Sequence, residues 1–248
     1  MALRVCRAEI GDSGDVRPDY QPVTVDTRHG THGSMESSVL QSLVLSVHSA
    51  TCLNRFTPSR HWEADQPPSE RGIEGWIEAI TVADRWSGIA AAAAAAQWAL
   101  PLVTSASNAN TGIDFGGPDD GLGGDVSPRE QVSRVRQWLK TPTPQATRAV
   151  SEAAERTRQL NVWDEDLRPL ADDPSTWYWY FVEAANLLTF AVVNNETGDP
   201  DGSDINWPAS VCAARSGVCA HRSIHAAGVT REVDAEAIIA AVRAALSH

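Results

Sequence analysis

The chain has 248 residues, which is enough to bury a sizeable core as one large domain or two small ones. Its 32 acidic and 20 basic side chains give a net charge of −12, which argues against nonspecific nucleic-acid binding, because that binding needs arginine and lysine against phosphate. No apolar run predicts a membrane span, and residues 1–34 contain no apolar core of a secretory signal. We therefore expect a soluble, cytoplasmic protein with reduced thiols.

The N-terminal segment differs in composition from the rest of the chain. Residues 11–34 are polar, contain Gly and Pro and show no periodicity, so we predict a flexible N-terminal arm over residues 1–34. Residues 35–248 are predicted to form a single helical domain. Its first apolar stripe comprises Val39, Leu40, Leu43, Val44 and Val47. Residues 51–68 hold three prolines and are expected to be a long connection.

The stretch from Ser69 to Ser107 gives the longest helical signal and is predicted to be the element against which the other helices pack. Ile73, Trp76, Ile77 and Ile80 form one helical stripe. Gly88 is expected to end or kink this helix. The alanines of Ala90–Ala96 favour helix and allow neighbouring helices to come close. Pro101 is expected to bend or break the second half.

Two helices with clear starts follow a Gly/Asp-rich loop over residues 108–126. Ser127 and Glu130 fit a capping box with Pro128 at the first helical position, and Thr143-Pro144 repeats the pattern. On the second of these helices, four charged side chains are expected to face water: Arg148, Glu152, Glu155 and Arg156.

The most apolar helix is predicted between Trp177 and Val193, where Glu183 is the only charge. Glu183 and Asn186 are either a buried acid–base group or a core polar pair satisfied by hydrogen bonds. Another Gly/Asp-rich loop spans residues 194–208, and Asp234 is expected to cap the last helix. The fold class is therefore all-α, an irregular bundle of about six or seven helices.

One cluster of residues has the chemistry of a metal site. Cys212, Cys219, His221 and His225 could supply two thiolates and two imidazoles to a zinc ion, since the histidines lie four apart on one helical face. Cys-x6-Cys is not a standard zinc spacing, and Gly217 suggests a break between the two halves. A disulfide between the cysteines and ordinary buried or surface residues are the alternatives.

Tryptophan is frequent, with nine in the chain. Those in helical stripes, Trp76, Trp138, Trp177 and Trp179, are expected in the core. Trp62, Trp163 and Trp207 lie in connections and, if exposed, could anchor a protein partner, because tryptophan is enriched in interface hot spots.

A resemblance covers roughly Arg85 to Asn194. An Ala-rich helix ends in Trp98-Ala-Leu-Pro-Leu, a linker follows, and then come Arg134-Val-Arg-Gln-Trp-Leu and a second Ala-rich helix. In this order the chain resembles small helical bacterial proteins that are identified as immunity proteins of toxin systems. AHRSIHAAG, with His221 and His225, is similar to a late Ala-His segment in some of them. This chain differs in its long arm, its Gly/Asp-rich loops and its additional aromatic helix. The resemblance implies toxin binding and no catalytic residues.

Three functions remain open from the sequence. The leading hypothesis is a non-enzymatic protein-binding module, in particular an immunity protein that covers a basic toxin site with an acidic face. A structural or assembly subunit is the second, and a metal-dependent enzyme using the cluster at residues 212–225 is the third. We predict a protein partner, no nucleic acid and no obligatory cofactor, with zinc as the cofactor of the third hypothesis.

Overall fold

A computed structural model describes residues 2–4, 22–24, 33–59, 66–110, 127–160, 176–198, 206–226 and 231–247. Within these ranges only the backbone is described for residues 2–4, 22–24, 33–37, 102–110, 157–160, 176–178, 225–226 and 231–234. Most of the predicted arm, residues 111–126 of the first predicted Gly/Asp-rich loop and residues 199–205 of the second lie outside the described residues.

In this part of the chain the structure has nine helices and two short strands. The strands are β1 (Ala2–Arg4) and β2 (Pro22–Thr24), which pair antiparallel with Leu3 opposite Val23. The helices are α1 (Gly33–Ser46), α2 (Ala50–Leu53), α3 (Pro68–Ala83), α4 (Arg85–Asn110), α5 (Pro128–Lys140), α6 (Pro144–Leu160), α7 (Thr176–Val193), α8 (Ala209–Ala226) and α9 (Arg231–Leu246).

The all-helical architecture of the domain is confirmed, with three differences in detail. Helix α2 lies inside the predicted connection, and α8 covers residues that were not counted among the expected helices. The described part therefore has more helices than the six or seven expected. The β1–β2 pair lies within the predicted arm, where no sheet was expected, because three residues per strand leave no alternating pattern to detect. Helix α9 begins at Arg231, three residues before the expected cap, Asp234.

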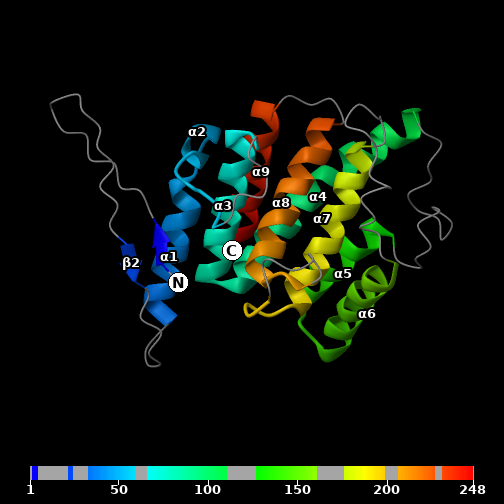
Figure 1. Ribbon diagram of the computed structural model, residues 1–248, viewed down its shortest axis with the longest axis horizontal. Helices are drawn as coiled ribbons and strands as arrows, with labels where there is room; N and C mark the ends of the chain where they lie inside the picture. The colour runs from blue at the N-terminus through cyan, green and yellow to red at the C-terminus, as the bar shows by residue number, and fades with distance from the viewer. Residues whose placement is uncertain are drawn as a thin grey trace.

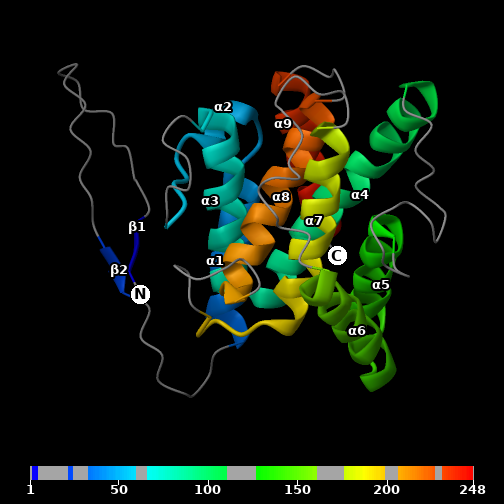
Figure 2. The same cartoon turned by 45° about the vertical axis from the view of Figure 1, so that its right-hand side comes forward.

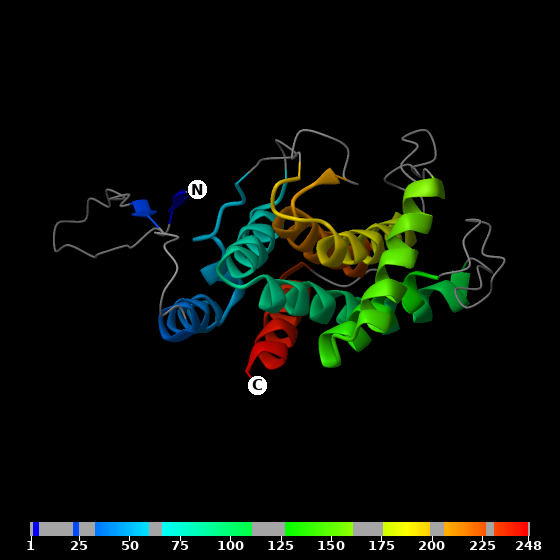
Figure 3. The same cartoon turned by 90° about the horizontal axis from the view of Figure 1, so that it is seen from below.

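Helix α8 lies at the centre of the domain, between α3 on one side and α7 on the other (Figure 1). Seen from below, α3, α8 and α7 form one layer, and α4 and α9 form a second layer against it (Figure 3). Helices α5 and α6 stand at one end, where both pack on α7 and α5 also packs on α4 (Figure 2). In the part of the chain that the structure describes, no helix is long and apolar enough to cross a membrane.

The central position of α8 follows from its small side chains. Every residue from Ala209 to Ala220 is buried, although the helix carries serines and an arginine. Gly217 lets α3 come close, because a Cβ there would lie 2.3 Å from Ile77 Cδ1. The expected break at Gly217 is therefore wrong: the glycine serves helix packing and α8 runs through it.

The expected breaks at Gly88 and Pro101 are also wrong. Helix α3 ends at Ala83, and Asp84 then adopts an extended conformation and accepts a 2.9 Å hydrogen bond from the Ser87 backbone N–H. Gly88 lies inside α4, where a Cβ would lie 2.0 Å from Thr81 Oγ1. Pro101 is exposed within α4, so its ring meets solvent rather than a neighbouring helix.

Several predicted contacts of the other helices are confirmed. The Ser127 side chain caps α5 by accepting a 3.3 Å bond from the Glu130 N–H, and Thr143 accepts a 3.1 Å bond from the Ala146 N–H at the start of α6. Arg148, Glu152, Glu155 and Arg156 are exposed on α6, as expected. Helix α7 is buried from Phe181 to Val192, apart from the half-buried Glu183.

The inner side of α4 predicts a strong response to overpacking. Within Ala90–Ala96, only Ala90 and Ala94 are partly exposed, and Ala93 is 2% exposed. We expect Ala93→Trp to lower the free energy of unfolding by at least about 1–3 kcal/mol, because α4 has no room for the ring. Urea unfolding of Ala93→Trp beside Ala94→Gln, which changes the outer side, checks this. Equal stability of Ala93→Trp and the wild type would show that this side of α4 is not packed.

Candidate functional site

The structure places three of the four predicted metal ligands on the buried helix α8. Cys212, Cys219 and His221 are each 0% exposed, whereas the side chain of His225 lies outside the described residues. Cys212 and Cys219 are seven residues apart in one helix, so they are separated by about 10 Å along its axis. A shared zinc would need each sulfur within about 2.3 Å.

The thiols of Cys212 and Cys219 are reduced. A disulfide between Cys212 and Cys219 is wrong, because neither takes part in a disulfide and two helical turns separate them. Burial, with Glu183 as the next cause, raises the pKa of the Cys219 thiol well above its usual range, which keeps it protonated. Among the described residues, no group of three or more His, Cys, Asp and Glu side chains could hold a metal ion. Participation of His225 stays a prediction.

The three tryptophans predicted to anchor a partner have different outcomes. Trp62 and Trp163 lie outside the described residues. Trp207 is 8% exposed and belongs to the core, and its backbone carbonyl accepts a 3.0 Å bond from Asn194 Nδ2. Trp207 lies in a connection, as predicted, but it does not meet the condition of exposure, and a side chain covered in this way offers a partner little surface.

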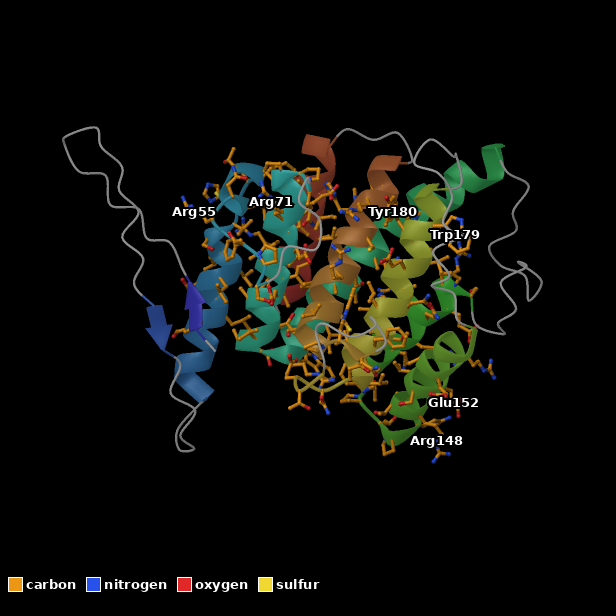
Figure 4. All side chains as sticks on the ribbon, viewed as in Figure 1. Arg55, Arg71, Arg148, Glu152, Trp179 and Tyr180 are labelled. Carbon is orange, nitrogen blue, oxygen red and sulfur yellow. The ribbon has the colours of Figure 1, made fainter. Side chains whose placement is uncertain are left out.

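A cluster of buried charges joins α3 to α8. Glu70 and Glu74 lie one turn apart on α3, and each faces an arginine of α8: Arg222 Nε lies 2.9 Å from Glu70 Oε2, and Arg215 Nη1 lies 3.7 Å from Glu74 Oε1. We call these four residues the α3–α8 charged cluster. Tyr180 of α7, labelled in Figure 4, adds its ring to the cluster. The ring centroid is 5.7 Å from the guanidinium carbon of Arg222.

The environment of Glu74 shows what the α3–α8 charged cluster can do. Burial raises the pKa of Glu74, against the lowering effects of Arg215 and of Gln66, whose Nε2 donates a 2.8 Å bond to Glu74 Oε2. A raised pKa suits a general acid, but Glu74 is only 1% exposed and no substrate atom could reach it without opening the helices. The cluster therefore holds α3 and α8 in register and offers no accessible chemistry.

The polar residues of α7 are also used in packing. Asn186 Oδ1 accepts a 2.8 Å bond from Gln131 Nε2 of α5, and both residues are buried. Asn186 thus has a core partner on another helix, in agreement with the satisfied-core interpretation of this residue. Glu183 is half-buried and acts electrostatically on Arg215 and Cys219.

The α3–α8 charged cluster predicts that stability depends on the pairing of Glu74 with Arg215 and not on the presence of the two charges. Glu74→Leu alone should lower the free energy of unfolding by about 3 kcal/mol, because it leaves the buried Arg215 without its α3 partner. Glu74→Leu combined with Arg215→Met should recover most of this loss, since two apolar side chains replace a pair that is costly to desolvate. Denaturant unfolding of both single variants and the double variant measures the coupling, and additive losses would contradict it.

An exposed aromatic and basic surface lies on α4 and α5. Trp86 of α4 stacks on Trp138 of α5, with ring centroids 4.5 Å apart and an interplanar angle of 33°. Trp138 Nε1 also donates a 3.1 Å bond to Thr147 Oγ1 of α6. One aromatic pair thus ties the outer sides of three helices together.

The same surface continues along both helices. Arg136 of α5 donates a 2.8 Å bond to Gln97 Oε1 of α4, beside Trp98, and Lys140 lies one turn beyond Arg136. Trp86 is 38% exposed and Trp98 is 46% exposed, which is unusual for such large apolar side chains. We call this surface the α4–α5 face; it comprises Trp86, Trp98, Arg136, Trp138 and Lys140.

The α4–α5 face is the best candidate for a functional site among the described residues. It offers flat apolar rings next to cations and contains no nucleophile–base pair, so it suits binding rather than bond cleavage. The sequence assigned Trp138 to the core and gave Trp98 only as part of a resemblance. The sequence signal that could have found this surface is the position of residues around the helix. The outer stripe of α4 comprises Trp86, Ala90, Ala94 and Gln97, with Trp98 beside it.

Comparison with known proteins gives no family for this chain. No protein-family model matches it, and no curated protein and no solved structure matches it either.

Proposed function

We propose that this chain is a non-enzymatic helical protein-binding module that binds its partner with the α4–α5 face. The observation that carries the proposal is the exposure of Trp98 at 46%, on the same helix as Trp86, whose ring stacks on Trp138. Covering these rings on binding removes apolar surface from water, and tryptophan and arginine are the residues most often found in interface hot spots.

The surface is also held in place before binding. The Trp138–Thr147 bond and the Arg136–Gln97 bond join α5 to α6 and to α4, so the aromatic and basic groups sit on packed helices. A partner that binds here pays little conformational entropy to order these side chains, which favours affinity.

In its more specific form the proposal is that the partner is a toxin and the chain is its bacterial immunity protein. The resemblance of Arg85–Asn194 to immunity proteins supports this form. The face would change one detail of the hypothesis: its charged residues, Arg136 and Lys140, are basic, so the toxin surface opposite them would be acidic rather than basic.

The proposal is tested by affinity capture with the full chain as bait, followed by calorimetry with the purified captured protein. Trp98→Ala should weaken binding by about 2 kcal/mol, or roughly 30-fold, because the largest exposed ring of the face is lost. Leu45→Ala is the matched control, since Leu45 is 63% exposed on α1 outside this face. It should leave the affinity unchanged.

Two results would count against the proposal. Equal losses from Trp98→Ala and Leu45→Ala would mean that the face has no special role, and unchanged affinity in both would place the binding surface elsewhere. The immunity form has its own test: co-expression with the captured protein should protect cells from it, and failure to protect would leave binding without immunity.

A further inference from the structure

Positive charge is concentrated in the α5–α6 hairpin. Residues 128–160 contain seven basic and three acidic side chains, a net charge of +4 in a chain whose total is −12, so the rest of the chain carries −16. On α5, Arg129, Ser133, Arg136 and Lys140 are all exposed and follow each other at spacings of four, three and four residues. This spacing places them on one stripe of the helix surface.

The cations of the hairpin differ in how they are compensated. Arg134 already has partners within the chain: it pairs with Glu130 at 2.5 Å and donates a 3.0 Å bond to the Ala149 carbonyl of α6. Arg136 meets only the neutral amide of Gln97. Within the described residues, no carboxylate lies at ion-pair distance from Arg136, Lys140 or Arg148.

This arrangement is unfavourable for the isolated chain. Arg136 and Lys140 are like charges four residues apart on a helix, a spacing that destabilises by about 0.2–0.5 kcal/mol. Lys140 lies in the last turn of α5, where the helix dipole favours a cation and offsets part of this repulsion. Arg136 lies before the last turn and is not stabilised in this way. Figure 4 shows Arg148 pointing outward from α6, so the hairpin presents cations on its outer side as well.

We propose that the partner of the α4–α5 face is an acidic protein segment, whose carboxylates bind Arg136 and Lys140 while an apolar side chain covers Trp98. This inference rests on the proposed function and names the chemistry of its partner. A guanidinium can bind a carboxylate through two parallel hydrogen bonds, and its present neutral partner, Gln97, yields readily to a charged one.

The strong negative charge of the remaining chain favours docking of this partner at the basic hairpin. At physiological salt, charges are screened beyond about 8 Å, so the local cations decide the contact energy at the face. The net charge of the chain outside the hairpin has the same sign as an acidic segment. The −16 charge therefore acts against wrong docking and leaves the basic hairpin as the favoured place of approach.

The probe for this inference is a synthetic glutamate-rich peptide with one central leucine, labelled with a fluorophore and titrated with the full chain. Fluorescence anisotropy should show binding that weakens as salt is added. The double variant Arg136→Glu and Lys140→Glu should lower the affinity about tenfold or more, because like charges then face each other. Arg55→Glu is the matched control, since Arg55 is exposed at the opposite end of the molecule (Figure 4), and it should bind as the wild type does.

The outcomes separate this inference from the proposed function. A captured partner that needs Trp98 but is insensitive to the double charge reversal would keep the proposed function and overturn the acidic-segment inference. A peptide bound through Arg136 and Lys140 with no effect of Trp98→Ala would overturn the proposed function while supporting the charge contact. Tighter binding of a single-stranded DNA oligomer than of the peptide, or no peptide binding at all, would overturn the inference. Circular dichroism confirms that each variant is folded.

Discussion

The structure depends on the burial of α8 among four other helices, which is possible because its two arginines face carboxylates and its serine hydroxyls make hydrogen bonds. Arg215 and Arg222 would be prohibitively costly in an apolar core, and Glu74 and Glu70 of α3 compensate them. The Ser216 hydroxyl donates a 2.7 Å bond to the Ala184 carbonyl of α7. With its charges and hydroxyls satisfied, α8 can bury its full circumference and bring α3, α4 and α7 around it.

The sequence predicted correctly those helices whose apolar pattern or capping residues lie within the helix itself. The α5 cap at Ser127 and the apolar α7 are examples, and both are confirmed. It did not find α8 as the centre, because alanine, serine, cysteine and arginine give no apolar stripe, and their burial depends on partners more than 100 residues away. It also treated Gly88 and Gly217 as helix breakers, where close packing against α3 explains the glycine, and Pro101, which α4 accommodates on its exposed side.

The candidate site shows a similar limit. The sequence made the tryptophans of connections into candidates, but Trp207 is buried. It did not consider Trp98 as a binding residue, although Trp98 is exposed. Which side of α4 meets solvent is set by the positions of α8 and α9, so no local pattern could assign Trp98. The basic composition of residues 128–160, by contrast, is fully visible in the sequence and was hidden by the use of a single net charge for the chain.

The contacts that close the core also bear on how the chain folds. Arg85, at the start of α4, donates hydrogen bonds of 2.6–3.0 Å to the carbonyls of Ala191, Val192 and Asn194 at the end of α7, more than 100 residues away. Glu70 and Arg222 are 152 residues apart, and Glu236 Oε1 accepts a bond from the Ala50 N–H across 186 residues. Helical bundles with mostly local contacts are the fastest folders, whereas loops of this length must close before such contacts form. The chain therefore combines the secondary structure of a helical bundle with many contacts between residues far apart in the sequence, a topology associated with slower folding.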